Sequence, residues 1–263
     1  MKIGIIGAGN MGGAIARGLA AGKKVSASDI SVCSPNNHHE LDCLKEFNLA
    51  LNVSTDNKVA VTNTDIVIVA VKPWLLDSVM EPLIPLMDFS RQMIVSIVAG
   101  ASLDHLASLA PKASPAVFSL IPNTAISVHE SMTFMCAKNA SCEQIQLVKD
   151  IFDELGETMV VEERLMGAGM ALASCGIAYV MRYIRAASEG GVELGMYASD
   201  AKKIVMQTML GAVKLLESTG NHPEAEIDKV TTPGGITIRG LNAMEANGFT
   251  TAVIEGLKAS VKK

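Results

Sequence analysis

The chain has 263 residues, 49% of them hydrophobic, and it carries a formal net charge of −5. This length and composition predict a globular protein with a full hydrophobic core, organised as one large domain or two smaller ones. The negative charge and the lack of Lys or Arg runs argue against a nucleic acid or an anionic membrane as a partner.

The cysteines are odd in number and form no Cys-x-x-Cys pair; they are Cys33, Cys43, Cys136, Cys142 and Cys175. They indicate neither a disulfide framework nor a zinc site, so we expect no metal ion. No apolar signal region precedes the first strand pattern, and no apolar run reaches the length that crosses a bilayer. We therefore expect a cytoplasmic protein without a membrane partner.

The first motif follows a short apolar run at Lys2–Ile6, which we expect to form a strand. Gly7, Gly9 and Gly12 come next, and apolar residues at helical spacing follow them. In such a strand, turn and helix, the first glycine permits a tight turn and the second lets a pyrophosphate approach the backbone. The third lets helix and strand pack closely. The pattern predicts a dinucleotide-binding site.

A second strand is expected at Ile30–Cys33. No acidic residue follows it at the position where a residue that binds the ribose hydroxyls is expected. Ser34 and Asn36 follow instead and lead into a helix. Small hydroxyl and amide donors at a helix start accept a 2′-phosphate, which a carboxylate would repel. NADP is the predicted cofactor, with NAD as the alternative. The adjacent His38 and His39 are interpreted as solvated residues of the first helical turn.

Strands and helices continue to alternate along the next hundred residues. Strands are expected at Leu49–Val53, Asp65–Val71, Met93–Val98, Ala116–Ile121, Met132–Cys136 and Glu157–Val161, with a helix at Cys142–Leu155. This alternation predicts an α/β fold, a doubly wound parallel Rossmann sheet over residues 1–161. Lys72 directly follows one of these strands, at the edge where open α/β sheets bind ligands.

From residue 162 onward the strand signals disappear. Helical patterns cover Leu165–Leu194, Ala198–Ser218 and Ile236–Leu257, so residues 162–263 are predicted to form an all-helical second domain. The first of these helices is apolar on nearly every face, and a single small domain rarely buries such a helix. A homo-oligomer that packs these helices together is the expected solution.

The stretch Val230–Leu241 combines helix-start signals with glycines. Thr231 or Thr232 is a candidate cap, Pro233 suits a first helical position, and Gly234 and Gly235 leave backbone N–H groups accessible. Such a start suits a carboxylate, and Thr237 would present a hydroxyl one turn later. On local chemistry alone, an ordinary capped turn explains the stretch equally well.

Taken together, four motifs make the whole chain resemble the pyrroline-5-carboxylate reductase family. They are Gly7–Gly12, Ala70–Pro73, Pro122–Thr124 and, most specifically, Thr232–Thr237. The resemblance implies a Rossmann domain followed by a helical domain that intertwines with its copy in a homodimer. It also implies NAD(P)H-dependent reduction of the cyclic imine 1-pyrroline-5-carboxylate to L-proline, the last step of proline biosynthesis.

The resemblance also implies the residues of the site. Cofactor contacts fall on Gly7, Ala8, Gly9, Asn10, Met11, Gly12, Ser34, Asn36, Asn57, Ala70, Val71, Lys72, Pro73, Ile97, Val98 and Ala99. Substrate contacts fall on Glu163, Thr232, Gly234, Gly235, Ile236 and Thr237. Thr237 is the expected catalytic residue, because its neutral hydroxyl would hydrogen-bond and polarise the ring nitrogen of the imine.

The chain departs from the family's pattern at Ala173–Ile177, where the family usually has a Ser-Gly-Ser-Gly-Pro-like run. Two alternatives stay open, and this departure motivates the second of them. One is a related imine or β-hydroxyacid reductase, although the helix at Leu165–Leu194 lacks the Lys that hydroxyacid enzymes usually place there. The other is a weakly active NADP-binding scaffold.

Overall fold

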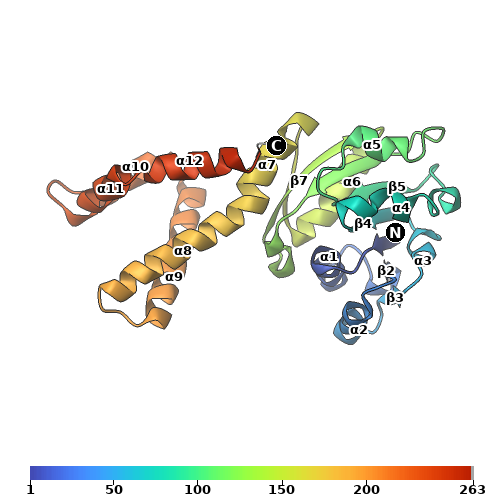
Figure 1. Ribbon diagram of the computed structural model, residues 1–263, viewed down its shortest axis with the longest axis horizontal. Helices are drawn as coiled ribbons and strands as arrows, with labels where there is room; N and C mark the ends of the chain where they lie inside the picture. Colours follow the sequence, from blue (N-terminus) through green and yellow to red (C-terminus); the bar gives the residue numbers. More distant parts are fainter. Residues whose placement is uncertain (262–263) are drawn as a thin grey trace. The chain divides into compact units, whose positions relative to one another are not determined.

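The computed structural model describes residues 1–261, which form two compact units, Met1–Ser174 and a second unit that starts at Cys175. The N-terminal unit contains a sheet, and the described part of the C-terminal unit consists of helices and loops (Figure 1). The domain boundary expected after Val161 stays a prediction. In the structure, the residues from there to Ser174 pack with the N-terminal unit.

Eight strands form one sheet in the order β3-β2-β1-β4-β5-β6-β7-β8. Their bounds are β1 Ile3–Ile6, β2 Ile30–Cys33, β3 Asn52–Ser54, β4 Ile66–Val69, β5 Met93–Ser96, β6 Val117–Ile121, β7 Ser131–Lys138 and β8 Gly156–Val160. Neighbours from β3 to β6 are parallel, and the order reverses between β1 and β4. The predicted α/β class with a Rossmann sheet is confirmed.

The sheet differs from the prediction at β7, which runs antiparallel to β6 and parallel to β8. The expectation of a wholly parallel sheet was wrong at this strand. Only residues 122–130 connect β6 to β7, and a 3-10 turn at Thr124–Val128 occupies most of them. A parallel neighbour requires a crossover of a dozen residues or more, so this short connection forces the reversal.

Alternate residues of the central strands enter two separate cores. Ile3, Ile5 and Ile68 face α1 (Asn10–Ala21), α2 (His38–Phe47) and α6 (Cys142–Phe152). Ile6 and Val69 face α3 (Lys58–Val61), α4 (Leu76–Met80) and α5 (Leu103–Ser108). Helices on both faces explain why these strands are aliphatic along their whole length.

The strand expected at Leu49–Val53 begins later, at Asn52, because the preceding residues form a turn. The backbone N–H of Leu51 donates to the carbonyl oxygen of Asn48 across 3.1 Å. Leu51 is fully buried from that turn rather than from the strand. In the sequence the aliphatic residue Leu51 therefore resembles the start of a strand, although it is buried from a loop.

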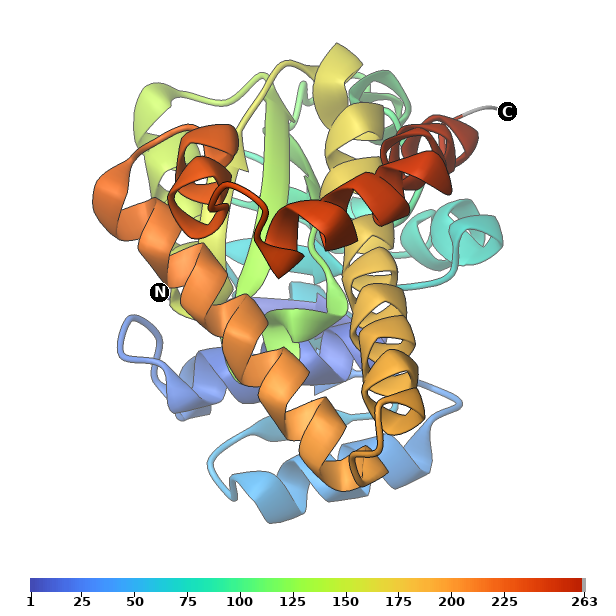
Figure 2. The same ribbon diagram turned by 90° about the vertical axis from the view of Figure 1, so that its left-hand side faces the viewer.

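The C-terminal unit contains α8 (Gly176–Glu193), α9 (Ala198–Thr219), α10 (Pro223–Val230), α11 (Ile236–Ala246) and α12 (Phe249–Ala259). The helices α8 and α9 pack together as a hairpin (Figure 2). The helix expected at Ile236–Leu257 is divided, because Gly248 adopts a φ of 78° that ends α11 before α12 begins. The short α10 was not predicted.

One helical segment of the described chain, Glu163–Glu193, is long and apolar enough to cross a membrane by length and composition. The expectation that no apolar run reaches that length was wrong. Four pieces join end to end, namely a 3-10 turn at Glu163–Leu165, α7 (Met166–Gly169), a π-helical turn at Met170–Cys175 and α8. Only 22% of its most apolar window is buried, so one chain leaves most of this surface uncovered.

Candidate functional site

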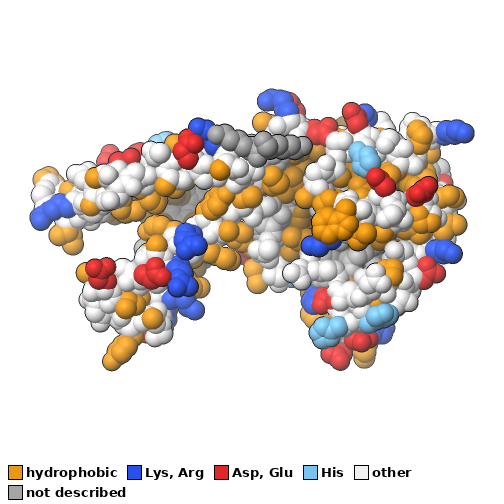
Figure 3. All heavy atoms as spheres, viewed as in Figure 1, with side chains coloured by type: hydrophobic (Ala, Val, Ile, Leu, Met, Phe, Trp, Pro, Cys, Tyr) orange, Lys and Arg blue, Asp and Glu red, His pale blue; other side chains and the backbone are white. Residues whose placement is uncertain are grey.

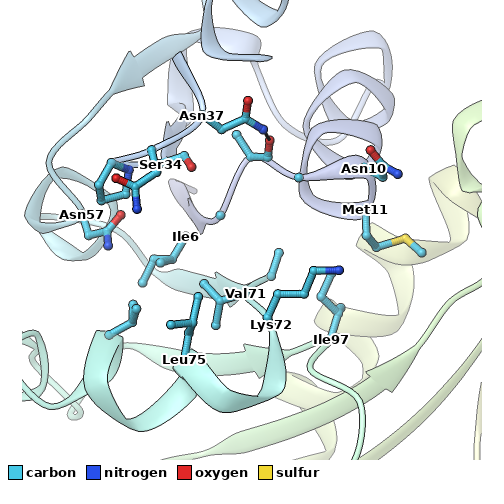
Figure 4. A pocket seen from close by; sticks show the side chains of 17 residues that line it. Ile6, Asn10, Met11, Ser34, Asn37, Asn57, Val71, Lys72, Leu75 and Ile97 are labelled. Atoms are coloured by element: carbon cyan, nitrogen blue, oxygen red, sulfur yellow. Dashed lines mark hydrogen bonds between the residues drawn. The ribbon is translucent and has the colours of Figure 1, made fainter. Parts of the chain in front are cut away.

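A cleft of about 570 Å³ lies at the carboxyl ends of the central strands, in the N-terminal unit (Figure 4). Its position beside the reversal between β1 and β4 is where doubly wound sheets bind dinucleotides. The lining residues are Ile6, Gly7, Ala8, Gly9, Asn10, Met11, Ser34, Pro35, Asn36, Asn37, Asn57, Ala70, Val71, Lys72, Leu75, Val79 and Ile97.

The three glycines of the first motif have three different environments. Gly7 has a φ of 103°, and a Cβ there would lie 2.5 Å from the carbonyl oxygen of Ala70. A Cβ on Gly12 would lie 1.9 Å from the carbonyl oxygen of Gly7, so this glycine lets α1 pack against the strand. Gly9 has no neighbour within 4 Å of its Cβ position and leaves its backbone open to the cleft.

The start of α1 is open to an anion. Gly9 is its N-cap, no side chain caps the helix, and no acidic residue stands in its first turn. The first backbone N–H groups of a helix lack partners within the helix, and its dipole is positive at this end. The helix therefore directs donors into the cleft at the place where Gly9 removes steric hindrance.

At the end of the cleft beside β2, the second helix is fixed to the glycine loop. Asn37 caps α2 by accepting from the N–H of Glu40, and its amide donates to the carbonyl oxygen of Ala8 across 2.5 Å (Figure 4). Ser34 and Asn36 lie just before this cap. No carboxylate side chain lines the cleft within the described residues, so nothing there repels a phosphate.

Asn57 contributes a buried acceptor to the same end of the cleft (Figure 4). Its side-chain oxygen is inaccessible to solvent and has no hydrogen-bond partner in the described chain. Buried polar atoms are nearly always paired, and leaving one unpaired costs about 1–3 kcal/mol. Because the atom is closed to solvent, its burial does not test the expected cofactor contact of Asn57, which stays a prediction.

At the opposite end of the cleft lies Lys72, the single charged residue among the described residues that line it. Lys72 follows β4, and its side chain extends between Met11 of α1 and Ile97 after β5 (Figure 4). Lys72 makes no ion pair with another described residue. An unpaired ammonium facing the open start of α1 gives this part of the cleft a positive potential.

Most of the residues predicted to contact a cofactor line this one cleft. Those outside its lining are Gly12, Pro73, Val98 and Ala99, and the cofactor contacts of all the predicted residues stay predictions. The prediction missed Ile6, Pro35, Asn37, Leu75 and Val79. Asn37 adjoins the predicted Asn36 and has the residue type of a helix cap, which could have revealed it. Leu75 and Val79 are spaced by four residues, as on one helical face.

Glu163 lies in a 3-10 turn at Glu163–Leu165 and interacts within the N-terminal unit. Its carboxylate accepts a hydrogen bond of 2.7 Å from the backbone N–H of Leu103, the first residue of α5. The predicted contact of Glu163 with a substrate is not tested by this geometry and stays a prediction.

The altered run at Ala173–Ile177 begins in the π-helical turn. Ala173 is buried, and the hydroxyl of Ser174 donates to the carbonyl oxygen of Pro122 across 2.8 Å. Asn123, which follows Pro122 in the chain, is also buried, and its side chain accepts from the N–H of Ala125. The altered run is thus attached to the Pro122–Thr124 motif, a relation that sequence spacing does not reveal.

Within the stretch Val230–Leu241, residues 232–235 form a turn that precedes α11. The N–H of Gly235 donates to the carbonyl oxygen of Thr232 across 2.9 Å, and Gly234 has a φ of 72°. Pro233 and Gly234 therefore occupy the centre of a type II turn, so the placement of Pro233 at a first helical position was wrong. The helix α11 starts at Ile236, after the N-cap Gly235.

As a result, Thr237 is the second residue of α11 rather than a residue one turn in. No side chain caps this helix, and its first turn has no acidic residue. Ile236 is 82% exposed, and Thr237 is exposed beside it. The arrangement offers open N–H donors and a hydroxyl at a positive helix end, which fits a carboxylate ligand.

Two family models match the two parts of the chain. Residues 2–100 match the model "NADP oxidoreductase coenzyme F420-dependent", and residues 163–263 match the model "Pyrroline-5-carboxylate reductase dimerisation". A solved structure of Plasmodium falciparum pyrroline carboxylate reductase with NADP bound is similar, with a TM-score of 0.88 and 28% identity. The match covers 99% of this chain and 95% of that one.

Curated relatives carry the same name. Pyrroline-5-carboxylate reductase 2 of Dictyostelium discoideum is 35% identical over 100% of this chain and 91% of its own length. The Synechocystis enzyme is 35% identical over 100% of this chain and 97% of its own. Pyrroline-5-carboxylate reductase 1 of D. discoideum is 39% identical, but this chain spans only 49% of its length. The chain belongs to the pyrroline-5-carboxylate reductase family, a family of oxidoreductases.

Proposed function

We propose that this protein reduces the C=N bond of 1-pyrroline-5-carboxylate to L-proline, the last step of proline biosynthesis. NADPH would be the hydride donor, with NADH as the alternative. The observation that carries the proposal is the cleft beside β1 and β4, where an uncapped α1, an open Gly9 and a lone cation face one space. Family membership supplies the substrate.

The residues of the cleft fit an adenine dinucleotide phosphate. Gly9, Asn10 and Met11 at the start of α1 would bind the pyrophosphate, which the ammonium of Lys72 would help to neutralise. Ser34 and Asn36 would bind the 2′-phosphate, and Asn57 would contact the adenosine portion. The related P. falciparum structure with NADP bound supports this choice of cofactor.

The nicotinamide would lie at the end of the cleft beside Lys72 and Ile97, opposite the end where Ser34 and Asn36 would bind the 2′-phosphate. Ala70, Val71 and Pro73, with Val98 and Ala99, complete the proposed cofactor contacts. Once bound, NADPH supplies a hydride for the imine carbon. The chain's own contribution is to orient the reacting groups and to hold the proton on the ring nitrogen.

For the substrate, we propose that the start of α11 binds the carboxylate of the imino acid. The contacts would come from Thr232, Gly234, Gly235 and Ile236, with Thr237 as the catalytic residue. The hydroxyl of Thr237 would hydrogen-bond the protonated ring nitrogen, which makes the imine carbon a better hydride acceptor. The absence of an acidic residue and of a side-chain cap at this helix start supports the proposal.

We further propose that the protein is a cytoplasmic homodimer formed through its C-terminal helices. The match of residues 163–263 to a dimerisation model supports this arrangement. Large apolar side chains are exposed along the helices, and Figure 3 shows hydrophobic side chains on their surface. Met181, Met206 and Val213 are each more than half exposed in a single chain. A second copy would remove this apolar area from water.

The test is an assay of NADPH oxidation by the purified protein with three substrates. Oxidation that requires 1-pyrroline-5-carboxylate, with L-proline as product, supports the proposal. If NADPH is oxidised only with the carbonyl compound that corresponds to a β-hydroxyacid, or only with an acyclic imine, the protein is a related reductase. Intact NADPH binding without turnover of any substrate would show the NADP-binding scaffold, which the altered run at Ala173–Ile177 suggested.

A further inference from the structure

The connection between β5 and α5, Ile97–Ser102, borders the proposed nicotinamide end of the cleft. Ile97 lines the cleft, and the N–H of Val98 donates to the buried hydroxyl of Ser96 across 3.2 Å. Gly100 turns with a φ of 80°, and no atom lies within 4 Å of its Cβ position. The first part of this connection is therefore fixed by β5, and its middle is open.

The last part of the connection is fixed by a residue from elsewhere in the sequence. Leu103 begins α5, and its N–H donates to the carboxylate of Glu163 across 2.7 Å, over a separation of 60 residues. Ser102 caps the same helix by accepting from the N–H of His105. Together the two acceptors satisfy two of the orphan donors at this helix start.

The carboxylate of Glu163 lies close to titratable groups of β7 and to the start of α5. Burial, and next the charge of Glu163, raise the pKa of the Cys136 thiol to about 11. On the same strand, the pKa of Lys138 is raised, first by its hydrogen bond to Asp104 of α5 and in smaller part by Glu163. The carboxylate thus lies in a polar cluster that joins α5 to the sheet and that Lys138 partly neutralises.

From these contacts we infer that Glu163 is a positioning residue, which fixes the Ile97–Ser102 connection against the nicotinamide by capping α5 through Leu103. The inference rests on the cofactor site of the proposed function, but it requires no contact of Glu163 with the substrate. Without the carboxylate, the N–H of Leu103 would lose its acceptor, and the α5 end of the connection would be held only by the Ser102 cap and the burial of Leu103. The nicotinamide half of the cofactor would then lose order, while the adenosine half would not.

The experiment compares binding of NADPH and of adenosine 2′,5′-bisphosphate, which contains only the adenosine half. Both dissociation constants are measured by calorimetry on wild type and on Glu163→Ala, Glu163→Gln and Glu162→Ala. Glu162 is a matched control, because it is the adjacent exposed carboxylate and, among residues 1–261, its side chain pairs only with Arg164, across 2.6 Å. Steady-state kinetics with the cyclic imine give kcat and KM for each variant.

For Glu163→Ala we expect NADPH affinity to fall about tenfold, as for a lost charge-assisted hydrogen bond. The affinity for adenosine 2′,5′-bisphosphate and the KM for the imine should stay at wild-type values, and kcat should fall. Glu163→Gln keeps an oxygen that accepts from Leu103, so it should restore NADPH affinity to within about threefold of wild type. Glu162→Ala should resemble wild type.

Three outcomes would overturn the inference. NADPH affinity of Glu163→Ala could equal that of wild type, with only the KM for the imine raised, which would show a substrate contact. Both ligands could lose affinity to the same extent, which would show a general loss of structure. Glu163→Gln could be as impaired as Glu163→Ala. Because the binding readouts need no turnover, a wild-type protein that binds NADPH but reduces no imine would contradict the proposed function alone.

Discussion

The hydroxyl of Ser174 donates a hydrogen bond to the carbonyl oxygen of Pro122, 2.8 Å away and 52 residues earlier in the chain. This bond joins the last residues of the N-terminal unit to the loop that follows β6. Replacing Ser174 with Ala should lower the free energy of unfolding by about 1 kcal/mol, since a partly buried acceptor loses its donor. In thermal unfolding the midpoint should fall by roughly 2–4 °C. The control is Ser218→Ala, which removes an exposed hydroxyl within α9 and should leave the midpoint of thermal unfolding unchanged.

Gly9 and Gly12 belong to one motif, but their substitution should have opposite consequences. A Cβ on Gly9 meets nothing in the protein, so Gly9→Ala should fold with wild-type stability and bind NADPH at least about tenfold more weakly. A Cβ on Gly12 would lie 1.9 Å from the carbonyl oxygen of Gly7. Gly12→Ala should therefore lower the thermal midpoint itself. Calorimetric titration and thermal unfolding separate the two effects, and equal stability of the two variants would contradict this assignment.

Lys72 should act through its charge on the cofactor. Lys72→Gln should weaken NADPH binding about tenfold, as expected for a lost charge-assisted contact, and should flatten the dependence of the dissociation constant on salt. Lys72→Arg should retain most of the affinity. Lys112, exposed and outside the lining of the cleft, provides the control in Lys112→Gln. An unchanged NADPH affinity in Lys72→Gln, together with a raised KM for the imine, would assign the ammonium to the substrate carboxylate instead.

Thr237 should be required for chemistry rather than for folding. Its side chain is exposed at the second position of α11, so Thr237→Ala should leave the thermal midpoint unchanged. Loss of a proton-holding hydroxyl should lower kcat/KM for the cyclic imine by about 100-fold. Thr237→Ser keeps the hydroxyl and should recover most of the activity. Turnover of Thr237→Ala within a few fold of wild type would remove Thr237 from the mechanism.

The buried cysteines should make stability depend on alkaline pH. Burial raises the pKa of both Cys33 and Cys136 from 9.0 to about 11 in the folded protein. Between these values an unfolded thiol loses its proton while the folded thiol keeps it, so the unfolded state is favoured as pH rises. The free energy of unfolding should be intact below pH 9 and should fall between pH 9 and pH 11.

The contribution of one thiol is isolated by comparing wild type with Cys136→Ala. Urea unfolding at several pH values should give a shallower fall for the variant over the same range, because one of the two shifted groups is absent. An identical slope would contradict the raised pKa of Cys136. At pH 8 a thiol reagent should modify the exposed Cys142 in the folded protein, and Cys136 only after denaturation.

Local sequence patterns predicted the features that depend on local physics. The aliphatic runs at β1, β2 and β4 marked buried parallel strands within two residues, because both faces of each strand are covered by helices. The glycines of the first motif were assigned three steric roles, and the structure shows these environments at Gly7, Gly9 and Gly12. The missing acid after β2 is visible in the sequence and agrees with the carboxylate-free lining of the cleft.

Two of the errors concern backbone geometry. The direction of β7 is set by a connection too short for a crossover, and the start of α11 by the left-handed conformation of Gly234. A Pro-Gly pair after Thr232 is itself a turn signal, so this second error was avoidable.

By itself, the sequence determined the fold class, the glycine-loop cleft and, through its motifs, membership of a reductase family. These follow from periodicity, steric size and residue chemistry, which act over a few neighbouring positions. Only the tertiary structure decided that Ser174 bonds to Pro122, that the oxygen of Asn57 is buried without a partner, and that Glu163 caps α5. Hydrogen-bond partners 52 and 60 residues apart are selected by how the strands and helices pack, and no local pattern encodes that choice.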